Sequence, residues 1–280
     1  MEYYMTDERI TEYLKALENE ERAAATIEKY RRAILNFAAF LSGTAVTPET
    51  IRLWKDELHE RNYAPSTINT YLAALNGFFH FCGWSDCRAR FLKIQRRLFR
   101  DSRQELTRAE YERLVAAAEA AGDRGLALLM ETICSTGIRV SEVQYITVEA
   151  AKNGKAEIAL KGKIRTILLP SKLCRKLLKF AARQKTASGA IFRAKSGNAM
   201  SRYQIWSKMK KLCERAGVDA EKVFPHNLRH LFATAFYRAY KDIVKLADVL
   251  GHSSIETTRI YLVTSAAEHR RQLELLQLVS

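Results

Sequence analysis

The residues in this sequence that are best suited to chemistry are basic ones in short motifs of its second half. His226 and Arg229 occur in PHNLRHLFAT, three positions apart, so a helix would point both side chains the same way. Arg139 lies in STGIRVSEV, after a Thr-Gly break and at an expected helix start, where backbone N–H groups add positive potential. Lys161 and Lys163 flank a glycine in a predicted tight turn. Together these residues predict a site for an anion.

The stretch LGHSSIETTRIYL adds a histidine and a tyrosine to this set. His252 follows Gly251 at another expected helix start, where Ser253 and Glu256 have the spacing of a capping box. Tyr261 belongs to the helix that would begin there. By spacing alone Tyr261 is a core aromatic, because helical aromatics usually face inward. Beside two arginines, two histidines and a turn lysine, its hydroxyl would also supply the nucleophile that a phosphodiester reaction needs.

These residues also have plainer interpretations. Arg139 and Glu142 have the spacing of a helical ion pair, His226 fits a buried core histidine, and the turn lysine fits an ordinary surface lysine. His226 and His230, four positions apart, raise the alternative of a metal site. A metal is disfavoured because Asn227 stands where a zincin motif carries glutamate, and no third ligand is apparent at usable spacing.

Charge is unevenly distributed along the 280 residues, whose formal net charge is +15. Residues 1–60 carry 12 acidic and 8 basic side chains, whereas residues 151–215 carry 18 basic side chains and 2 acidic ones. A segment this one-sided repels itself unless an anion neutralises it, and the long polyanion inside cells is nucleic acid. The alternative is a basic protein that is merely soluble.

The remaining composition favours a cytoplasmic, nucleoid-associated protein without a membrane partner. No apolar run approaches the roughly 20 residues that a membrane span requires, and the acidic, polar start does not fit a signal peptide. The five cysteines are scattered and form no CxxC pair. Reduced thiols are therefore expected, rather than disulfides or a zinc site.

Hydrophobic periodicity predicts two domains that are mainly α-helical. The first, residues 1–98, is a four-helix bundle, with helices expected at 10–21, at 26–43, from Thr47-Pro48 and from Pro65. A basic linker follows at 99–105. The second domain, residues 106–280, is α+β. Thr107 would cap its first helix, a buried helix follows at 125–137, and alternating residues within 147–170 indicate a small antiparallel β-sheet.

The order of these motifs resembles the tyrosine recombinase, or phage integrase, family. STGIRVSE, a lysine on a β-turn, HNLRH and LGHSSIETTRIY reproduce the family's Arg…Lys…His-x-x-Arg…His/Trp…Tyr order. The likeness covers nearly the whole chain, in a Xer-like organisation: a SAM-like core-binding bundle and a catalytic domain, without an arm-binding domain. The catalytic residues implied by matching position are Arg139, Lys161, His226, Arg229, His252 and the nucleophile Tyr261. Glu142 and His230 match supporting positions, and Lys163 is the alternative to Lys161.

The resemblance implies site-specific DNA recombination through a covalent intermediate. Tyr261 would attack a DNA phosphate, form a 3′-phosphotyrosine link and expel a 5′-hydroxyl that Lys161 protonates. The two arginines and His252 would stabilise charge on the phosphoryl oxygens, while His226 assists proton transfer. Because tyrosine has an ordinary pKa of about 10, it needs cationic neighbours or a base to react. The covalent link conserves the bond energy, so neither a metal nor another cofactor is expected.

The implied partners are DNA and further copies of the chain. A double-stranded core recombination site would bind a dimer, and two such sites would meet in a tetrameric synapse. An accessory DNA-bending protein or a partner recombinase would be an additional partner. The candidate DNA contacts are Lys29, Arg32, Thr67, Asn69, Lys163 and Arg165. In the family a C-terminal tail such as residues 268–280 docks on a neighbouring protomer; the alternative is that it packs on its own domain.

Two other functions share some of these features. An enzyme like a type IB topoisomerase would use the same chemistry without strand exchange, but the short bipartite chain and its tail argue against this. A DNA-binding protein without enzymatic activity would have no use for Tyr261. Integration, excision, inversion and chromosome-dimer resolution all use the same layout, so the sequence leaves the biological process and the target DNA open.

Overall fold

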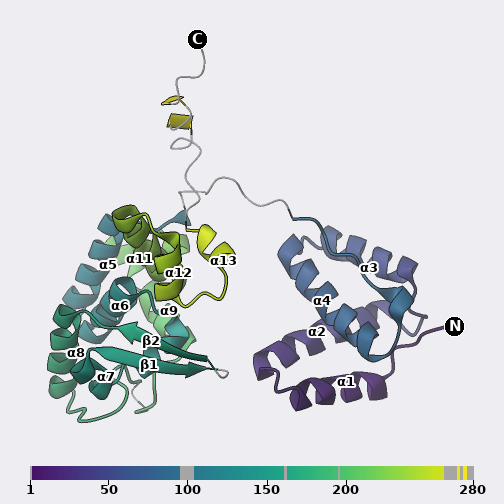
Figure 1. Ribbon diagram of the computed structural model, residues 1–280, viewed down its shortest axis with the longest axis horizontal. Coiled ribbons are helices and arrows are strands. Elements are labelled where there is room, and N and C mark those ends of the chain that lie inside the picture. Colours follow the sequence, from purple (N-terminus) through teal and green to yellow (C-terminus); the bar gives the residue numbers. More distant parts are fainter. Residues whose placement is uncertain are drawn as a thin grey trace. The chain divides into compact units, whose positions relative to one another are not determined.

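The computed structural model describes residues 2–94, 104–160, 163–194, 196–261, 270–271 and 274–275. The chain divides into two compact units, Met1–Arg96 and Arg97–Ser280, which are described separately below (Figure 1). The predicted linker at 99–105 lies mostly outside the described residues, because the structure does not describe 95–103. The same holds for the apolar side predicted for the C-terminal tail, formed by Leu273, Leu276 and Val279.

The described residues of unit 1, 2–94, form four α-helices and one 3-10 turn. The elements are α1 (Asp7–Asn19), α2 (Ala24–Leu41), α3 (Pro48–Glu60), α4 (Pro65–Phe81) and η1 (Ser85–Cys87). Prolines occupy the first position of α3 and α4, where the missing N–H costs no helical hydrogen bond. Buried aromatic rings fill the centre of the bundle, with Phe37 and Trp54 centroids 5.0 Å apart. The four predicted helices are therefore present.

Two asparagines of α4 fasten the chain that follows it. The side-chain amide of Asn69 donates to the carbonyl of Leu92 at 2.9 Å and accepts from its N–H at 2.7 Å. Asn76 makes the same pair of bonds with Ala89, at 3.0 and 2.8 Å. Asn69 was expected to contact DNA, but its amide is engaged inside the unit. Asn69 therefore holds the chain that follows α4, and its contact with DNA stays a prediction.

Unit 2 is mainly helical. Its helices are α5 (Arg108–Ala120), α6 (Arg124–Thr136), α7 (Val148–Asn153), α8 (Ser171–Arg183), α9 (Arg202–Lys210), α10 (Cys213–Ala216), α11 (Pro225–Tyr240), α12 (Ile243–Leu250) and α13 (Ile255–Arg259), with 3-10 turns η3 (Val140–Tyr145) and η4 (Ala220–Lys222). The apolar helix α6 packs against α5, α8, α9 and α11 and buries most of its side chains. Thr107 caps α5 in a capping box with Glu110, as predicted.

A two-stranded antiparallel sheet interrupts the helices. Strand β1 (Lys155–Leu160) pairs with β2 (Lys163–Leu168) in a register that sets Leu160 opposite Lys163, and the hairpin lies beside α7 (Figure 1). Lys161 and Gly162, between these strands, lie outside the described residues. The fold is mainly α with a small antiparallel sheet, which confirms the predicted fold class.

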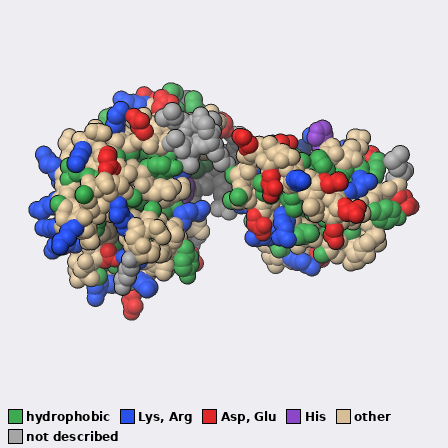
Figure 2. Space-filling view, turned by 90° about the horizontal axis from the view of Figure 1, so that it is seen from below, with side chains coloured by type: hydrophobic (Ala, Val, Ile, Leu, Met, Phe, Trp, Pro, Cys, Tyr) green, Lys and Arg blue, Asp and Glu red, His purple; other side chains and the backbone are tan. Residues whose placement is uncertain are grey.

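The two units differ in surface charge. Lysines and arginines crowd the surface of unit 2, whereas acidic and basic side chains are mixed on unit 1 (Figure 2). This contrast follows the uneven distribution of charge along the sequence. Among the described residues, no helix combines the length and the apolarity that a membrane span requires.

Candidate active site

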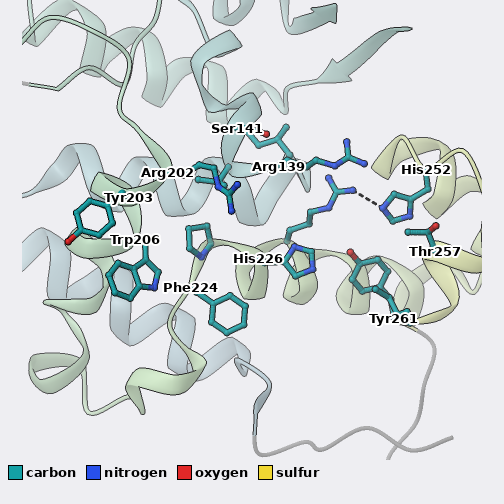
Figure 3. A pocket seen from close by; sticks show the side chains of 15 residues that line it. Arg139, Ser141, Arg202, Tyr203, Trp206, Phe224, His226, His252, Thr257 and Tyr261 are labelled. Atoms are coloured by element: carbon teal, nitrogen blue, oxygen red, sulfur yellow. Dashed lines mark hydrogen bonds between the residues drawn. The ribbon is translucent and has the colours of Figure 1, made fainter. Parts of the chain in front are cut away.

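Five predicted site residues line one cleft of unit 2. The cleft has a volume of about 810 Å³ and is lined by Arg139, His226, Arg229, His252 and Tyr261, together with ten other residues. The five come from four segments: the residue before η3, helix α11, the turn after α12 and the turn after α13. Tyr261 thus follows the helix to which the sequence assigned it, because α13 ends at Arg259. Figure 3 shows His226, His252 and Tyr261 close together in this cleft. The fold therefore joins motifs that are far apart in the sequence.

Arg229 forms the buried floor of the cleft, with 2% of its surface exposed. Its guanidinium donates to the carbonyls of Gly137 and Leu250 and to Nε2 of His252, the last two at 2.9 Å (Figure 3). Burial lowers the pKa of Arg229 to about 10, and the charge of Arg139 adds to this effect, while the hydroxyl of Tyr261 opposes it. Arg229 thus remains a cation near neutral pH, held by neutral acceptors.

A second arginine, Arg139, is held by a buried carboxylate. Glu142 is 2% exposed and accepts from the backbone N–H of Arg139 at 2.7 Å and from its guanidinium at 2.8 Å. This is the ion pair that the i,i+3 spacing favoured. The side chain of Arg139 nevertheless remains 42% exposed and lines the cleft. The pair orients Arg139 while leaving part of its guanidinium accessible to an anion.

Arg165 of β2 pairs with the same carboxylate. Its guanidinium lies 3.0 Å from both oxygens of Glu142 and donates to the carbonyl of Val249 at 2.6 Å, with 13% of the side chain exposed. Arg165 was expected to contact DNA. Its guanidinium links the hairpin to Glu142 and to α12, and its contact with DNA stays a prediction.

The end of helix α12 holds all three arginines. Three successive carbonyls, of Val249, Leu250 and Gly251, accept hydrogen bonds from Arg165, Arg229 and Arg139 in that order. These carbonyls have no partner within an ideal helix and carry the negative end of the helix dipole. The helix end therefore stabilises a cluster of cations that has one carboxylate, Glu142, as its buried counterion.

His252 is held in one tautomer. Because Arg229 can only donate, Nε2 of His252 must accept, and Nδ1 must carry the proton that it shares with Oγ1 of Thr258 at 2.9 Å. Burial, followed by the charges of Arg229, Arg139 and Arg165, lowers the pKa of His252 to about 4. The imidazole is therefore neutral near pH 7.

Tyr261 packs as a core residue although it lines the cleft. It is 4% exposed and belongs to a small apolar cluster with Ala233, Leu246 and Leu250. Its ring lies edge-on to His230 at 4.6 Å and stacked with His252 at 6.0 Å, between centroids. Its hydroxyl is directed toward the side of the cleft where His226 lies (Figure 3). Tyr261 thus combines core packing with a hydroxyl at the cleft.

The other predicted residues take several positions. His230 is half-buried beside Tyr261, Lys29 and Arg32 are exposed on α2, and Thr67 is half-buried at the start of α4. Lys161 lies outside the described residues, and so does the side chain of Lys163, so neither alternative for the catalytic lysine is tested. The described residues contain no group of three or more histidine, cysteine or acidic side chains placed to hold a metal ion.

Sequence reasoning misplaced one cap and missed several residues. Ser254, not Ser253, caps α13 by accepting from the N–H of Glu256, because the helix begins at Ile255. Thr258 was not singled out, although it is fully buried and fixes the tautomer of His252. The spacing of six residues between them gives no helical signal, since His252 precedes the helix. The cleft-lining aromatic pair on α9 was missed as well.

Comparison with protein families identifies the chain. The model of the phage integrase family matches residues 104–268, and that of the phage integrase N-terminal SAM-like domain matches residues 10–85. The chain therefore belongs to the phage integrase family. Tyrosine recombinase XerA of Pyrococcus furiosus is 28% identical, over 96% of this chain and 94% of its own length. Tyrosine recombinase XerD of Brucella suis biovar 1 is 30% identical, over 90% of this chain and 91% of its own length.

Solved structures show the same fold. The XerH site-specific recombinase bound to its difH substrate, in a pre-cleavage complex, has a TM-score of 0.69 and 20% identity, covering 95% of this chain and 84% of that one. A lambda integrase tetramer bound to a Holliday junction has a TM-score of 0.74 and 18% identity, covering 91% of this chain and 76% of that one.

Proposed function

We propose that this member of the phage integrase family is a site-specific DNA recombinase that uses Tyr261 as its nucleophile. The chain is a tyrosine recombinase, an enzyme that cleaves and rejoins DNA. In the forward step Tyr261 Oη forms a bond to phosphorus while the bond from phosphorus to the 5′ oxygen breaks. The phenolic proton passes to His226, and Lys161 supplies a proton to the departing 5′ oxygen. Attack by the 5′-hydroxyl of a second strand reverses the step.

The observation that carries this proposal is the convergence of a phenol, two arginines and two histidines on one cleft. A phosphodiester carries negative charge that grows on its non-bridging oxygens in the transition state. Arg139 presents an accessible guanidinium, and Arg229 adds a buried positive charge beneath the same space. Two cations in a partly desolvated cleft stabilise this charge more strongly than they would in water.

We propose a part for His252 besides the expected one, which stays a prediction. The sequence predicted that it stabilises the phosphoryl charge directly, together with the arginines. In the free protein it is neutral, and its Nε2 lone pair accepts from Arg229. We assign it the positioning of Arg229, with Thr258 holding the ring from the other side.

The proposed strand exchange involves several copies of the chain. Relatives of the same fold are dimers on a core site or a tetramer on a Holliday junction. We propose the same for this chain: a dimer on each double-stranded core site, a tetramer in the synapse, and action in the cytoplasm at the nucleoid. The C-terminal tail would link protomers, and no metal or other cofactor would take part.

The test begins with the unknown DNA site. Duplexes that bind the full chain are selected from a random library, and the consensus is rebuilt as a suicide substrate with a nick beside each candidate scissile phosphate. The wild type is expected to form an SDS-resistant protein–DNA adduct. The short fragment between the scissile phosphate and the nick, which carries the released 5′-hydroxyl, diffuses away and cannot rejoin. Phosphotyrosine at Tyr261 is then identified by peptide mass.

Matched variants separate chemistry from folding. Tyr261→Phe keeps the buried ring and should bind the site normally but form no adduct, whereas Tyr240→Phe, at an exposed position on α11, should behave as the wild type. Adduct from Tyr261→Phe at wild-type yield would reject Tyr261 as the nucleophile. A second assay joins two marked sites: adduct without recombinant product would instead favour a relaxing enzyme like a type IB topoisomerase.

A further inference from the structure

Helix α9 exposes two large aromatic side chains beside the catalytic groups. Tyr203 is 73% exposed and Trp206 is 41% exposed, and their ring centroids lie 5.8 Å apart at an angle of 33°. The helix is anchored on its other side by the buried residues Ile205 and Met209. Neither aromatic ring is therefore required to hold α9 in the core, and both expose apolar surface to solvent.

The aromatic pair lies in the same cleft as the proposed nucleophile. Tyr203 and Trp206 line the cleft that also contains His226 and Tyr261. In Figure 3 the two rings stand at one end, His252 and Tyr261 at the other, and His226 between them. A ligand whose phosphate reaches His226 and Tyr261 therefore extends toward the rings.

The charge around the pair is positive. Arg202 lines the cleft next to Tyr203, and the ammonium of Lys210 lies over the ring of Trp206, 5.6 Å from its centroid. The helix contains no acidic residue, and its surroundings belong to the strongly basic segment 151–215. Aromatic rings framed by cations suit an anionic polymer with flat apolar parts, which is the chemistry of DNA.

We infer that Tyr203 and Trp206 contact the substrate DNA next to the scissile phosphate and position that phosphate for attack by Tyr261. The inference rests on the proposed function. The rings would pack on the base or sugar of a neighbouring nucleotide, while Arg202 pairs with a phosphate. Because every nucleotide of a duplex presents a sugar and a base edge, this contact fixes position and tolerates changes of sequence.

Tryptophan fluorescence gives a direct test. The chain has three tryptophans, and Trp54 and Trp84 are buried at 1% and 4% exposure, so Trp206 should dominate quenching by acrylamide. The protein is used as Tyr261→Phe, which binds without cleaving, with a duplex that carries one half-site and holds one protomer. Bound DNA should reduce the quenching at least several-fold, and Trp206→Phe should remove most of the quenchable signal from the free protein.

Affinity and cleavage give the second readout. Loss of the apolar contact between Trp206 and a nucleotide should weaken the affinity roughly 10- to 150-fold, which corresponds to about 1.5–3 kcal/mol for the burial of a large apolar side chain. Trp206→Ala should weaken half-site binding and slow adduct formation by about 10-fold or more, and Trp206→Phe should restore most of both. The control Tyr240→Ala removes a ring that is more exposed than Trp206, at 65%, from the end of α11 and should change neither.

The outcomes distinguish this inference from the proposed function. Unchanged quenching in a complex that a mobility shift shows to be complete would overturn the contact, and so would equal losses from Trp206→Ala and Tyr240→Ala. Neither result would affect the adduct assay on Tyr261. Conversely, shielding of Trp206 in Tyr261→Phe, together with a wild type that binds the suicide substrate but forms no adduct on it, would reject the proposed function and leave the contact in place.

Discussion

Three guanidinium groups, those of Arg139, Arg165 and Arg229, are held at the end of α12, and the first two also pair with the buried carboxylate of Glu142. Such a cluster repels itself, and the neutral acceptors around it are what make it stable: helix-end carbonyls and the imidazole of His252. Protonation of His252 would add a fourth cation to this cluster. The depressed pKa of His252 therefore reflects its neighbours as well as its burial.

The pKa of His252 predicts how stability depends on pH. An unfolded histidine binds its proton near pH 6.5, whereas His252 in the folded protein binds it only near pH 4. Between these values protonation favours the unfolded chain. The stability contributed by neutral His252 should thus be complete above pH 6.5 and be lost as the pH falls toward 4.

Denaturant unfolding at several pH values checks this prediction. The wild type should lose more free energy of unfolding between pH 7 and pH 4.5 than His252→Gln does, since carboxyl groups titrate alike in both proteins. Parallel curves for the two proteins would contradict the depressed pKa.

The sequence predicted the types of the reactive residues better than their partners. Arg139, His226, Arg229, His252 and Tyr261 could be singled out because their order along the chain matches a known motif, and the structure brings them to one cleft. The partners of Arg165 could not be found in the same way. Val249 is 84 positions away, and only the packing of the hairpin against α12 brings them together.

At the scale of elements, helix boundaries followed local chemistry. The prolines that begin α3 and α4 and the capping box of α5 are visible in the sequence, and the structure contains them. The start of α13 was set one residue early, because two adjacent serines offer equivalent caps and only the path of the turn after α12 selects Ser254. That turn depends on Gly251, which ends α12 in the left-handed region at φ 62°.

Two glycine substitutions should separate backbone strain from loss of the site. Gly154 ends α7 at φ 69° with nothing within 4 Å of an added Cβ, so Gly154→Ala should cost only about 1–2 kcal/mol for the left-handed conformation. At Gly251 an added Cβ would come within 2.4 Å of the Arg165 side chain. Gly251→Ala should therefore cost about 1–3 kcal/mol more and displace Arg165.

Thermal or denaturant unfolding measures the two losses, and the adduct assay reports on the cleft. Gly154→Ala should retain nearly normal cleavage, whereas Gly251→Ala should reduce it at least 10-fold at a temperature where both proteins remain folded. Equal effects of the two substitutions on both readouts would show that the contact with Arg165 is unimportant.

At the scale of the whole molecule, the two family models match separate stretches of the chain. The SAM-like model matches within residues 10–85 and the integrase model within residues 104–268. Composition predicts a polyanionic partner but no base sequence, since contacts to phosphate are alike at every site. For this reason the base sequence of the target DNA cannot be predicted from the amino-acid sequence.

The charge of unit 2 predicts a steep dependence of DNA affinity on salt. If six or more phosphates are neutralised, raising the salt concentration from about 50 to 200 mM should lower the affinity by about 10³-fold or more. Fluorescence anisotropy with a selected site and with a scrambled duplex checks this, and both affinities should fall in parallel. Affinity for the selected site that hardly changes with salt would contradict binding through phosphates.

The three carbonyls at the end of α12 have one more consequence. Arg139, Arg165 and Arg229 come from distant parts of the chain, yet all are tethered to Val249–Gly251, and the segment that carries Tyr261 begins directly afterwards. Because all three arginines are hydrogen-bonded to this short peptide, its rotation would disturb all three. A movement of this segment that displaced Tyr261 would therefore displace all three guanidinium groups as well.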